Sequence, residues 1–239
     1  MKWSHFFTSA VGRKLVMALT GLFLISFLIV HVGLNATIFY DLDFFDPTDN
    51  GSMFNRAAHF MGASLVIRIM EIGLFAGILL HIIQGYAIEA KNRSRRGGHD
   101  YKVDLGNRGS KWYSRSMALL GTLILLFLIV HVAHFWVPSR ITHDLEPAIY
   151  RNGTVETHNL FLRMYEVFQQ LWVVLLYLAG VASLAFHLFH GFHSAFRTIG
   201  VHNRKYLTML KSLGYGFTII VAILFALMPI SMYFGWVQP

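Results

Sequence analysis

Five long apolar runs constrain this chain more than any other feature. They occupy residues 15–36, 61–90, 116–137, 171–196 and 213–233. A helix needs about 20 apolar residues to cross a bilayer, and a spanning helix satisfies its own backbone hydrogen bonds. The sequence therefore predicts an all-α integral membrane protein with five transmembrane helices. Residues 1–239 form one membrane domain, with no separate soluble domain.

The composition agrees with lipid as the main solvent and limits the chemistry. Only 13% of the residues are charged, against about 25% in a soluble domain. The chain has no cysteine, which excludes disulfides, iron–sulfur ligation and covalent c-type haem attachment. Any metal or haem must therefore be held by the 13 histidines or by methionine.

The basic residues predict the orientation of the five helices. The N-terminal segment and the segments that follow the second and fourth runs would lie on one side of the membrane, and together they contain 15 Lys and Arg residues. The segments on the other side contain four. Cytoplasmic segments carry the excess of Lys and Arg, so we expect the N-terminus inside and the C-terminus outside. The net charge of +8 thus reflects membrane topology rather than nucleic-acid binding. Segments 37–60 and 138–170 would face outward, and both are long enough for short helices.

The first and third runs contain an internal repeat. ALTGLFLISFLIVHV (residues 18–32) and ALLGTLILLFLIVHV (residues 118–132) share nine of 15 positions. Each copy places a glycine ten residues before a histidine, Gly21 before His31 and Gly121 before His131. A weaker echo links the second and fourth runs, where a histidine precedes a glycine by four residues (His81 and Gly85, His187 and Gly191).

Four histidines lie inside the first four runs at matched depths. At about 1.5 Å per helical residue, His31 and His131 lie towards the outer side. His81 and His187 each precede a basic residue by ten positions, which places them roughly 15 Å from the inner boundary. An ionisable residue inside a span is costly and indicates function. The histidines therefore sort into an outer pair and an inner pair.

Paired imidazoles at two depths favour two bis-histidine haem sites built in the bundle of the first four helices. Small glycines such as Gly21, Gly121, Gly85 and Gly191 would let each macrocycle approach the backbone. The alternatives are interhelical hydrogen bonds and zinc, although tetrahedral zinc gathers its ligands in one place. His134 remains an alternative to His131. Further along the fourth run, His190 and His193 remain candidates to meet a haem propionate, a quinone or a partner.

Two segments resemble one known family. GRKLVMALTGLFLISFLIVH (residues 12–31) and FHLFHGFHSAFRTIG (residues 186–200) resemble the cytochrome b membrane anchor of succinate dehydrogenases and fumarate reductases. The likeness is to the five-helix, di-haem type on one polypeptide, and it covers all five runs in order. Some members carry a glutamate two residues before the fourth-helix ligand, where this chain has Ala185. That difference puts a transmembrane proton route in doubt.

The resemblance implies both cofactors and partners. His31 and His131 would bind the outer haem b, and His81 and His187 the inner one. His187 is selected over His190 because it lies 13 residues before Gly200. An iron–sulfur subunit and a flavoprotein subunit with FAD would be partners at the inner (cytoplasmic) membrane of the cell, and electrons would reach a quinone, for which the resemblance suggests menaquinone. The resemblance also allows a dimer of the whole complex.

The quinone site rests on two polar residues in the outer half of the second run. Arg68 and Glu71 lie three residues apart, on one helix face. They either satisfy each other structurally, or Arg68 meets an outer haem propionate and Glu71 takes part in quinone protonation. Three other functions are open: a haem b subunit of another quinone-linked dehydrogenase or hydrogenase, a proton-coupled transporter, and a structural anchor without haem.

Overall fold

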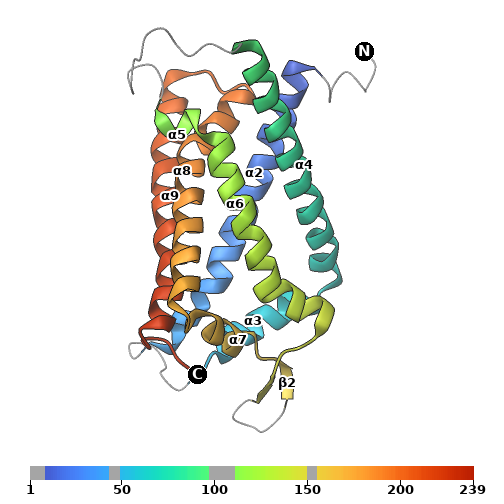
Figure 1. Cartoon of the computed structure of the whole chain (residues 1–239), viewed down its shortest axis with the longest axis vertical. Coiled ribbons are helices and arrows are strands. Elements are labelled where there is room, and N and C mark those ends of the chain that lie inside the picture. The colour runs from blue at the N-terminus through green and yellow to red at the C-terminus, as the bar shows by residue number, and fades with distance from the viewer. Residues whose placement is uncertain (1–8, 43–48, 97–110, 150–154) are drawn as a thin grey trace. The chain divides into compact units, whose positions relative to one another are not determined.

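The computed structural model describes residues 9–42, 49–96, 111–149 and 155–239. Within these residues, five helices are long and apolar enough to cross a membrane: Ala10–Tyr40, Leu65–Arg95, Met117–Thr142, Leu171–Thr198 and Arg204–Tyr233. The expected all-α membrane fold with five spanning helices is confirmed to this extent (Figure 1). Parts of the basic and acidic segments discussed above, residues 1–8, 43–48, 97–110 and 150–154, lie outside the described residues.

The long helices are α2 (Ala10–Asn35), α4 (Leu65–Arg96), α6 (Met117–His131), α8 (Leu171–Thr198) and α9 (Arg204–Tyr233). Shorter helices are η1 (Ala36–Asp41), α3 (Ser52–Ala63), α5 (Trp112–Arg115), η2 (Val132–Trp136), η3 (Pro138–Thr142) and α7 (Leu160–Phe168). Strands β1 (Pro147–Ile149) and β2 (Val155–His158) form an antiparallel pair. The short helices α3 and α7 fall in the two segments expected to face outward.

The second apolar run is divided where its sequence suggested one continuous helix. Ser64 has an extended backbone (ψ 124°) and separates α3 from α4. The β1–β2 pair, between the third and fourth runs, was also not expected. Its register slips between Ala148 and Ile149, so the pair is short and irregular.

The end of the third span is wound as a π-helix rather than an α-helix, in η2 and η3. Proline has no backbone N–H, so Pro138 cannot donate to the carbonyl of His134, its normal partner four residues earlier. The Arg163 Nε group donates to that carbonyl instead, at 3.3 Å. The proline thus changes the winding and frees a carbonyl that a later segment uses.

Contacts divide the chain into two compact units. The first unit comprises Met1–Phe27, Ile72–Leu123 and Ser183–Ile219. The second unit comprises Leu28–Glu71, Ile124–Ala182 and Ile220–Pro239. Each long helix contributes residues to both units, and each unit is described by itself below.

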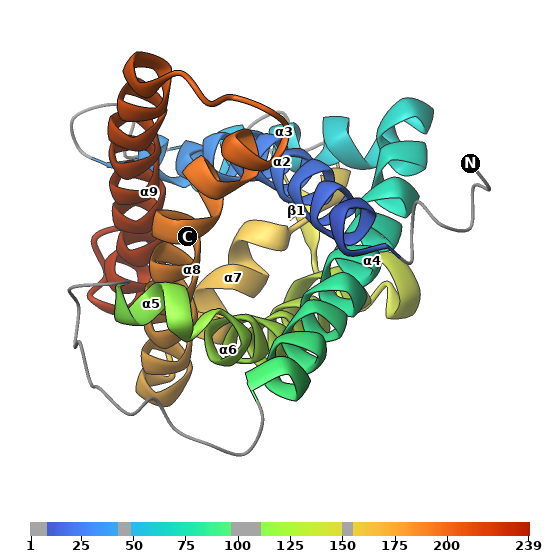
Figure 2. The ribbon, with the colours of Figure 1, turned by 90° about the horizontal axis from the view of Figure 1, so that it is seen from above.

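In the first unit, segments of α2, α4, α6 and α8 surround a common centre, and α9 packs beside α8 (Figure 2). A hydrogen bond of 2.7 Å between the hydroxyls of Tyr86 and Thr122 joins α4 to α6. A Cβ on Gly214 would lie 2.7 Å from the Phe192 ring, so only glycine allows α9 this close to α8. At the end of α8, Gly200 adopts a φ of +110°, a conformation that glycine adopts without strain.

In the second unit, a buried asparagine joins two short helices. Asn55 of α3 is 2% exposed. Its amide nitrogen donates to Asn159 Oδ1 at 3.0 Å, and its own oxygen accepts from the Phe161 backbone N–H at 3.0 Å. Asn159 in turn caps α7 by accepting from the Leu162 N–H at 2.9 Å. Both polar side-chain atoms of Asn55 therefore have a partner, as burial requires.

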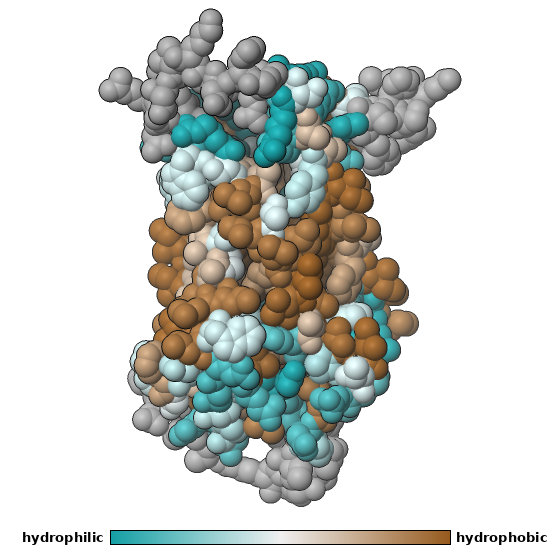
Figure 3. Space-filling view, in the orientation of Figure 1, coloured by the Kyte–Doolittle hydropathy of each residue, from teal (hydrophilic) through white to brown (hydrophobic). Residues whose placement is uncertain are grey.

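The surfaces of the long helices are apolar. Hydrophobic residues gather over them, and hydrophilic residues gather over the helix ends and connecting segments (Figure 3). On α4, Leu65, Ile72 and Leu79 are 72%, 72% and 59% exposed. Large apolar surface of this extent is unusual on a water-soluble chain, which supports contact with lipid.

Candidate functional site

Two histidine rings face each other in the first unit. His81 of α4 and His187 of α8 have ring centroids 6.2 Å apart and planes inclined by 64°. Both rings lie among apolar helices, where an imidazole is costly. The structure thus brings together the two histidines that their depth in the sequence paired.

A hydroxyl on a third helix holds one of these rings. Thr20 Oγ1 of α2 lies 3.0 Å from His81 Nδ1. The same hydroxyl donates to the carbonyl of Val16 at 2.8 Å, with the Met17 carbonyl at 3.2 Å. The opposite ring differs, because His187 Nδ1 is buried and has no hydrogen-bond partner.

The other histidines of α8 form a separate cluster. His190 and His193 have ring centroids 5.7 Å apart, so His190 contacts its own helix neighbour.

Two tyrosines of the first unit are joined by their hydroxyls. The hydroxyl of Tyr113, in the short helix α5 before the third span, lies 3.5 Å from that of Tyr215. This hydrogen bond, together with burial, raises the pKa of Tyr113 to about 12. Tyr113 is therefore neutral at physiological pH.

The second unit contains the other histidine pair. His31 of α2 and His131 of α6 have ring centroids 5.8 Å apart and planes inclined by 88°. The Asn35 amide nitrogen lies 3.3 Å from His31 Nδ1 and donates to the His31 carbonyl at 2.8 Å. His131 Nδ1 is buried without a hydrogen-bond partner. Each pair therefore combines one ring with a polar neighbour at Nδ1 and one ring without.

Aromatic side chains hold His131 in place. The Phe127 ring stacks on His131 at 5.6 Å and 28°, and the Tyr177 ring lies 6.0 Å from it. A Cβ on Gly180 would come within 2.5 Å of the Phe127 ring, so glycine is required for this packing. The Tyr177 hydroxyl is hydrogen-bonded to His134 Nδ1 at 3.0 Å. His134 thus pairs with tyrosine, while His131 faces His31.

The ring separations of both histidine pairs are compatible with two imidazoles on opposite sides of one haem iron. A bond of about 2 Å between metal and imidazole nitrogen, with the ring centre about 1 Å behind it, places two opposed rings about 6 Å apart. The measured separations are 6.2 Å and 5.8 Å. Buried polar atoms normally have partners, and the Nδ1 atoms of His131 and His187 are exceptions in this structure.

A shared metal cluster of another kind has less support. Within residues 9–42, 49–96, 111–149 and 155–239, no three His, Cys, Asp or Glu side chains gather as metal ligands. Tetrahedral zinc sites need such a group. A haem iron needs only two protein ligands, one on each side of the porphyrin.

The four candidate glycines all belong to the first unit, the unit of His81 and His187. A Cβ on Gly21 would lie 3.6 Å from His81 Cε1, and one on Gly121 or Gly191 would meet nothing within 4 Å. On Gly85 it would lie 3.4 Å from the Met17 methyl. Protein atoms therefore leave room for a methyl group at these positions.

Arg68 and Glu71 have different partners in the second unit. Arg68 Nε donates to the Gly62 carbonyl at 3.2 Å. Glu71 accepts a hydrogen bond from Trp136 Nε1 and lies 3.6 Å from Arg140 Nε. The acidic group is thus held against the end of the third span, which the sequence did not indicate.

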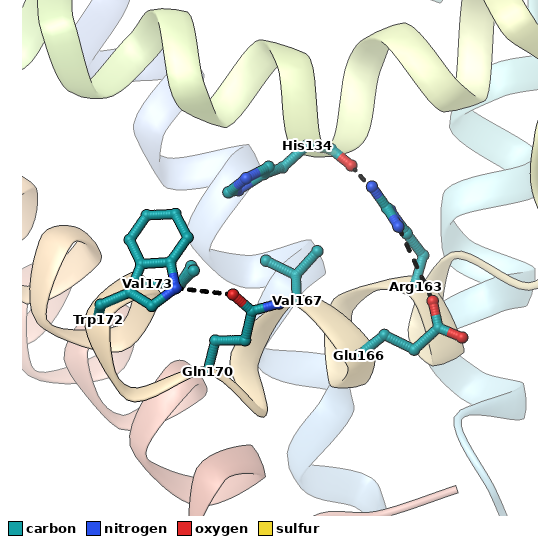
Figure 4. Close-up of a pocket in the computed structure, with 7 residues that line it drawn as sticks. All are labelled: His134, Arg163, Glu166, Val167, Gln170, Trp172 and Val173. Carbon is teal, nitrogen blue, oxygen red and sulfur yellow. Dashed lines mark hydrogen bonds and ion pairs between the residues drawn. The ribbon is translucent and has the colours of Figure 1, made fainter.

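A pocket of about 220 Å³ lies near His134 in the second unit. Figure 4 shows His134, Arg163, Glu166 and Gln170 around it, with the Trp172 indole donating to the Gln170 amide oxygen at 2.7 Å. Arg163 links the His134 carbonyl to Glu166, at 3.3 Å and 3.9 Å. His134 connects the pocket with His131, because His134 is hydrogen-bonded to Tyr177 and the Tyr177 ring lies next to that of His131.

Sequence reasoning missed Thr20, Tyr177 and Phe127, which hold the paired rings. One signal for Thr20 was present in the sequence. The two copies of the repeat differ at this position, where the first copy has the polar Thr20 and the second has the apolar Leu120. Nothing comparable marked Tyr177 or the pocket residues. In comparisons with protein-family models, curated proteins and solved structures, nothing matches this chain.

Proposed function

We propose that the chain is the membrane anchor and electron conduit of a succinate:quinone oxidoreductase, with two b-type haems. The observation that carries the proposal is the pair of opposed imidazole couples, His31 with His131 and His81 with His187, at 5.8 Å and 6.2 Å. When bound, the two haems would supply one-electron transfer between an iron–sulfur subunit and quinone. An FAD flavoprotein subunit would perform the succinate or fumarate chemistry, for which this chain carries no motif.

The chain's own residues would bind, orient and exclude water. The four histidines would hold iron, and the small Gly21 and Gly121 would admit a macrocycle. Apolar helices around the rings would keep water from the centres, which sets their potentials. Arg68 and His190 are proposed to face haem propionates.

Glu71 is proposed to exchange protons with the quinone, because its reduction consumes protons. Trp136 and Arg140 position the Glu71 carboxyl. We place the protein in the inner (cytoplasmic) membrane of the cell, with its N-terminus in the cytoplasm, because Lys and Arg concentrate on the side of the N-terminus.

A visible spectrum of the purified chain tests this proposal. We expect a b-type α-band and about two haems per chain. The four variants His31→Ala, His131→Ala, His81→Ala and His187→Ala should each retain about one haem. The first two should lose the same haem, and the last two the other.

His190→Ala is the comparison variant, since His190 lies three residues from His187 on the same helix and is proposed to face a propionate rather than the iron. It should keep both haems. If His187→Ala keeps both and His190→Ala loses one, the ligand assignment on α8 is wrong. A colourless protein would reject the conduit and favour a transporter or a bare anchor.

A further inference from the structure

The hydrogen bonds of Thr20 decide where the His81 ring carries its proton. A hydroxyl has one hydrogen to donate and two lone pairs. Thr20 uses its hydrogen on the backbone of its own helix, at 2.8 Å from the Val16 carbonyl. Towards His81 Nδ1, at 3.0 Å, the hydroxyl can then only accept. With the hydroxyl hydrogen assigned to the nearer Val16 carbonyl, Nδ1 is the donor in this contact and Nε2 keeps its lone pair.

The other three rings have different groups at Nδ1. Nδ1 of His131 and Nδ1 of His187 are buried without a hydrogen-bond partner. His31 Nδ1 faces the amide nitrogen of Asn35 at 3.3 Å, and an amide nitrogen donates rather than accepts. His81 Nδ1, by contrast, faces a hydroxyl with a free lone pair.

The second copy of the internal repeat has no counterpart of the contact between Thr20 and His81. At the position of Thr20, the second copy has Leu120. Its own threonine comes two residues later, and the Thr122 hydroxyl bonds the Ala118 carbonyl and Tyr86. The threonine hydroxyl is therefore a feature of one centre and not a general property of the two repeated helices.

We propose that Thr20 is a positioning residue that fixes the Nδ1–H tautomer of His81 and sets the reduction potential of the centre that His81 shares with His187. This inference rests on the proposed haem function. A hydrogen-bond acceptor at the second nitrogen fixes the ring orientation and raises the basicity of the ligating nitrogen. A more basic ligand stabilises ferric iron, so the hydroxyl holds the potential of this centre down.

Redox titration of the purified full chain tests the role of Thr20. In Thr20→Val, which keeps the shape and removes the acceptor, we expect the potential of one haem to rise and its affinity to fall about 10- to 100-fold. The affected haem should be the one that His81→Ala loses. Thr20→Ser, which restores the hydroxyl, should return both properties. The matched control Thr122→Val removes a hydroxyl from the other repeat copy and should leave both potentials unchanged.

The outcomes separate this inference from the proposed function. A wild-type chain without haem rejects the proposed function itself. Two haems whose potentials are unchanged in Thr20→Val, or shift equally, reject the role of Thr20 alone. If Thr20→Val is not recovered folded, Thr20→Cys replaces it, because a thiol of similar size accepts hydrogen bonds weakly. The same shift of one potential is then required.

Discussion

Single residues give the four candidate ligands different surroundings. His81 has a hydroxyl at Nδ1, His31 has an amide, and His131 and His187 have no partner at that atom. Such differences matter because groups around a ligand tune a metal centre as much as the ligands do. Two centres with the same ligand types would thus have different potentials, which a directional electron path requires.

Gly121→Ala tests whether a macrocycle passes close to the first-unit backbone. A Cβ at Gly121 meets no protein atom within 4 Å, and alanine favours a helix over glycine by about 1 kcal/mol. The folded chain should therefore be recovered at full yield. We expect loss of the haem that His81→Ala also loses, measured by haem-to-chain ratio, and Gly21→Ala should behave similarly.

The control is Gly33→Ala on α2, where a Cβ also meets nothing within 4 Å but which belongs to the second unit. It should keep both haems. Retention of both haems in Gly121→Ala and Gly21→Ala would show that these glycines serve another purpose.

Glu71→Gln tests proton exchange with the quinone. The glutamine keeps an acceptor oxygen for Trp136 but cannot carry a proton, so haem content should not change. General acid–base catalysis contributes roughly 10²- to 10⁴-fold, and we expect quinol-driven haem reduction, followed by stopped flow, to slow by at least about 100-fold. Glu89→Gln, in an exposed pair with Arg93, should keep the wild-type rate. An unchanged rate in Glu71→Gln would leave Glu71 as a structural acceptor.

At the scale of the elements, breaks in the helices place the polar groups. Extended Ser64 separates α3 from α4, and the π-helical turns around Pro138 end the third span. Both breaks lie in the second unit. The His134 carbonyl accepts a hydrogen bond from Arg163 Nε, and Arg163 lines the pocket. π-Helical turns occur frequently at functional sites.

Gly180→Ala tests the packing of α6 against α8. The added methyl would come within 2.5 Å of the Phe127 ring, which must then move against His131. Overpacking typically costs about 1–3 kcal/mol. We expect a lower unfolding midpoint in an SDS titration and weaker binding of the haem that His131→Ala loses, with the other haem unchanged. A double variant, Gly180→Ala with Phe127→Leu, should recover part of both; no recovery would contradict the packing argument.

At the scale of the whole molecule, five helices are long and apolar enough to cross a membrane within the described residues, and the distribution of basic residues predicts their direction. With five spans, the two termini would lie on opposite sides. The basic N-terminal and connecting segments would be cytoplasmic.

Reporter fusions test this orientation. Alkaline phosphatase, which is active only outside the cytoplasm, should be active when joined after residue 239. Joined after residue 202, between α8 and α9, it should be inactive, and green fluorescent protein should show the reverse pattern. An active phosphatase at residue 202 would overturn the predicted topology.

The sequence by itself determined which segments form helices long and apolar enough to cross a membrane, because run length and lack of charge favour a spanning helix in lipid. It also predicted the depth of each histidine along its helix, since depth follows from helical rise. The pairing of His31 with His131 and of His81 with His187 could be predicted from depth alone.

Only the tertiary structure decided what each ring meets. Thr20 and His81 are 61 residues apart in the chain, and His134 and Tyr177 are 43 apart. No periodicity relates such positions. Likewise, the sequence placed Glu71 beside Arg68, whereas packing gave it Trp136 and Arg140. Helix rotation and the break before α4 set these contacts, and both depend on how side chains of several helices fit together.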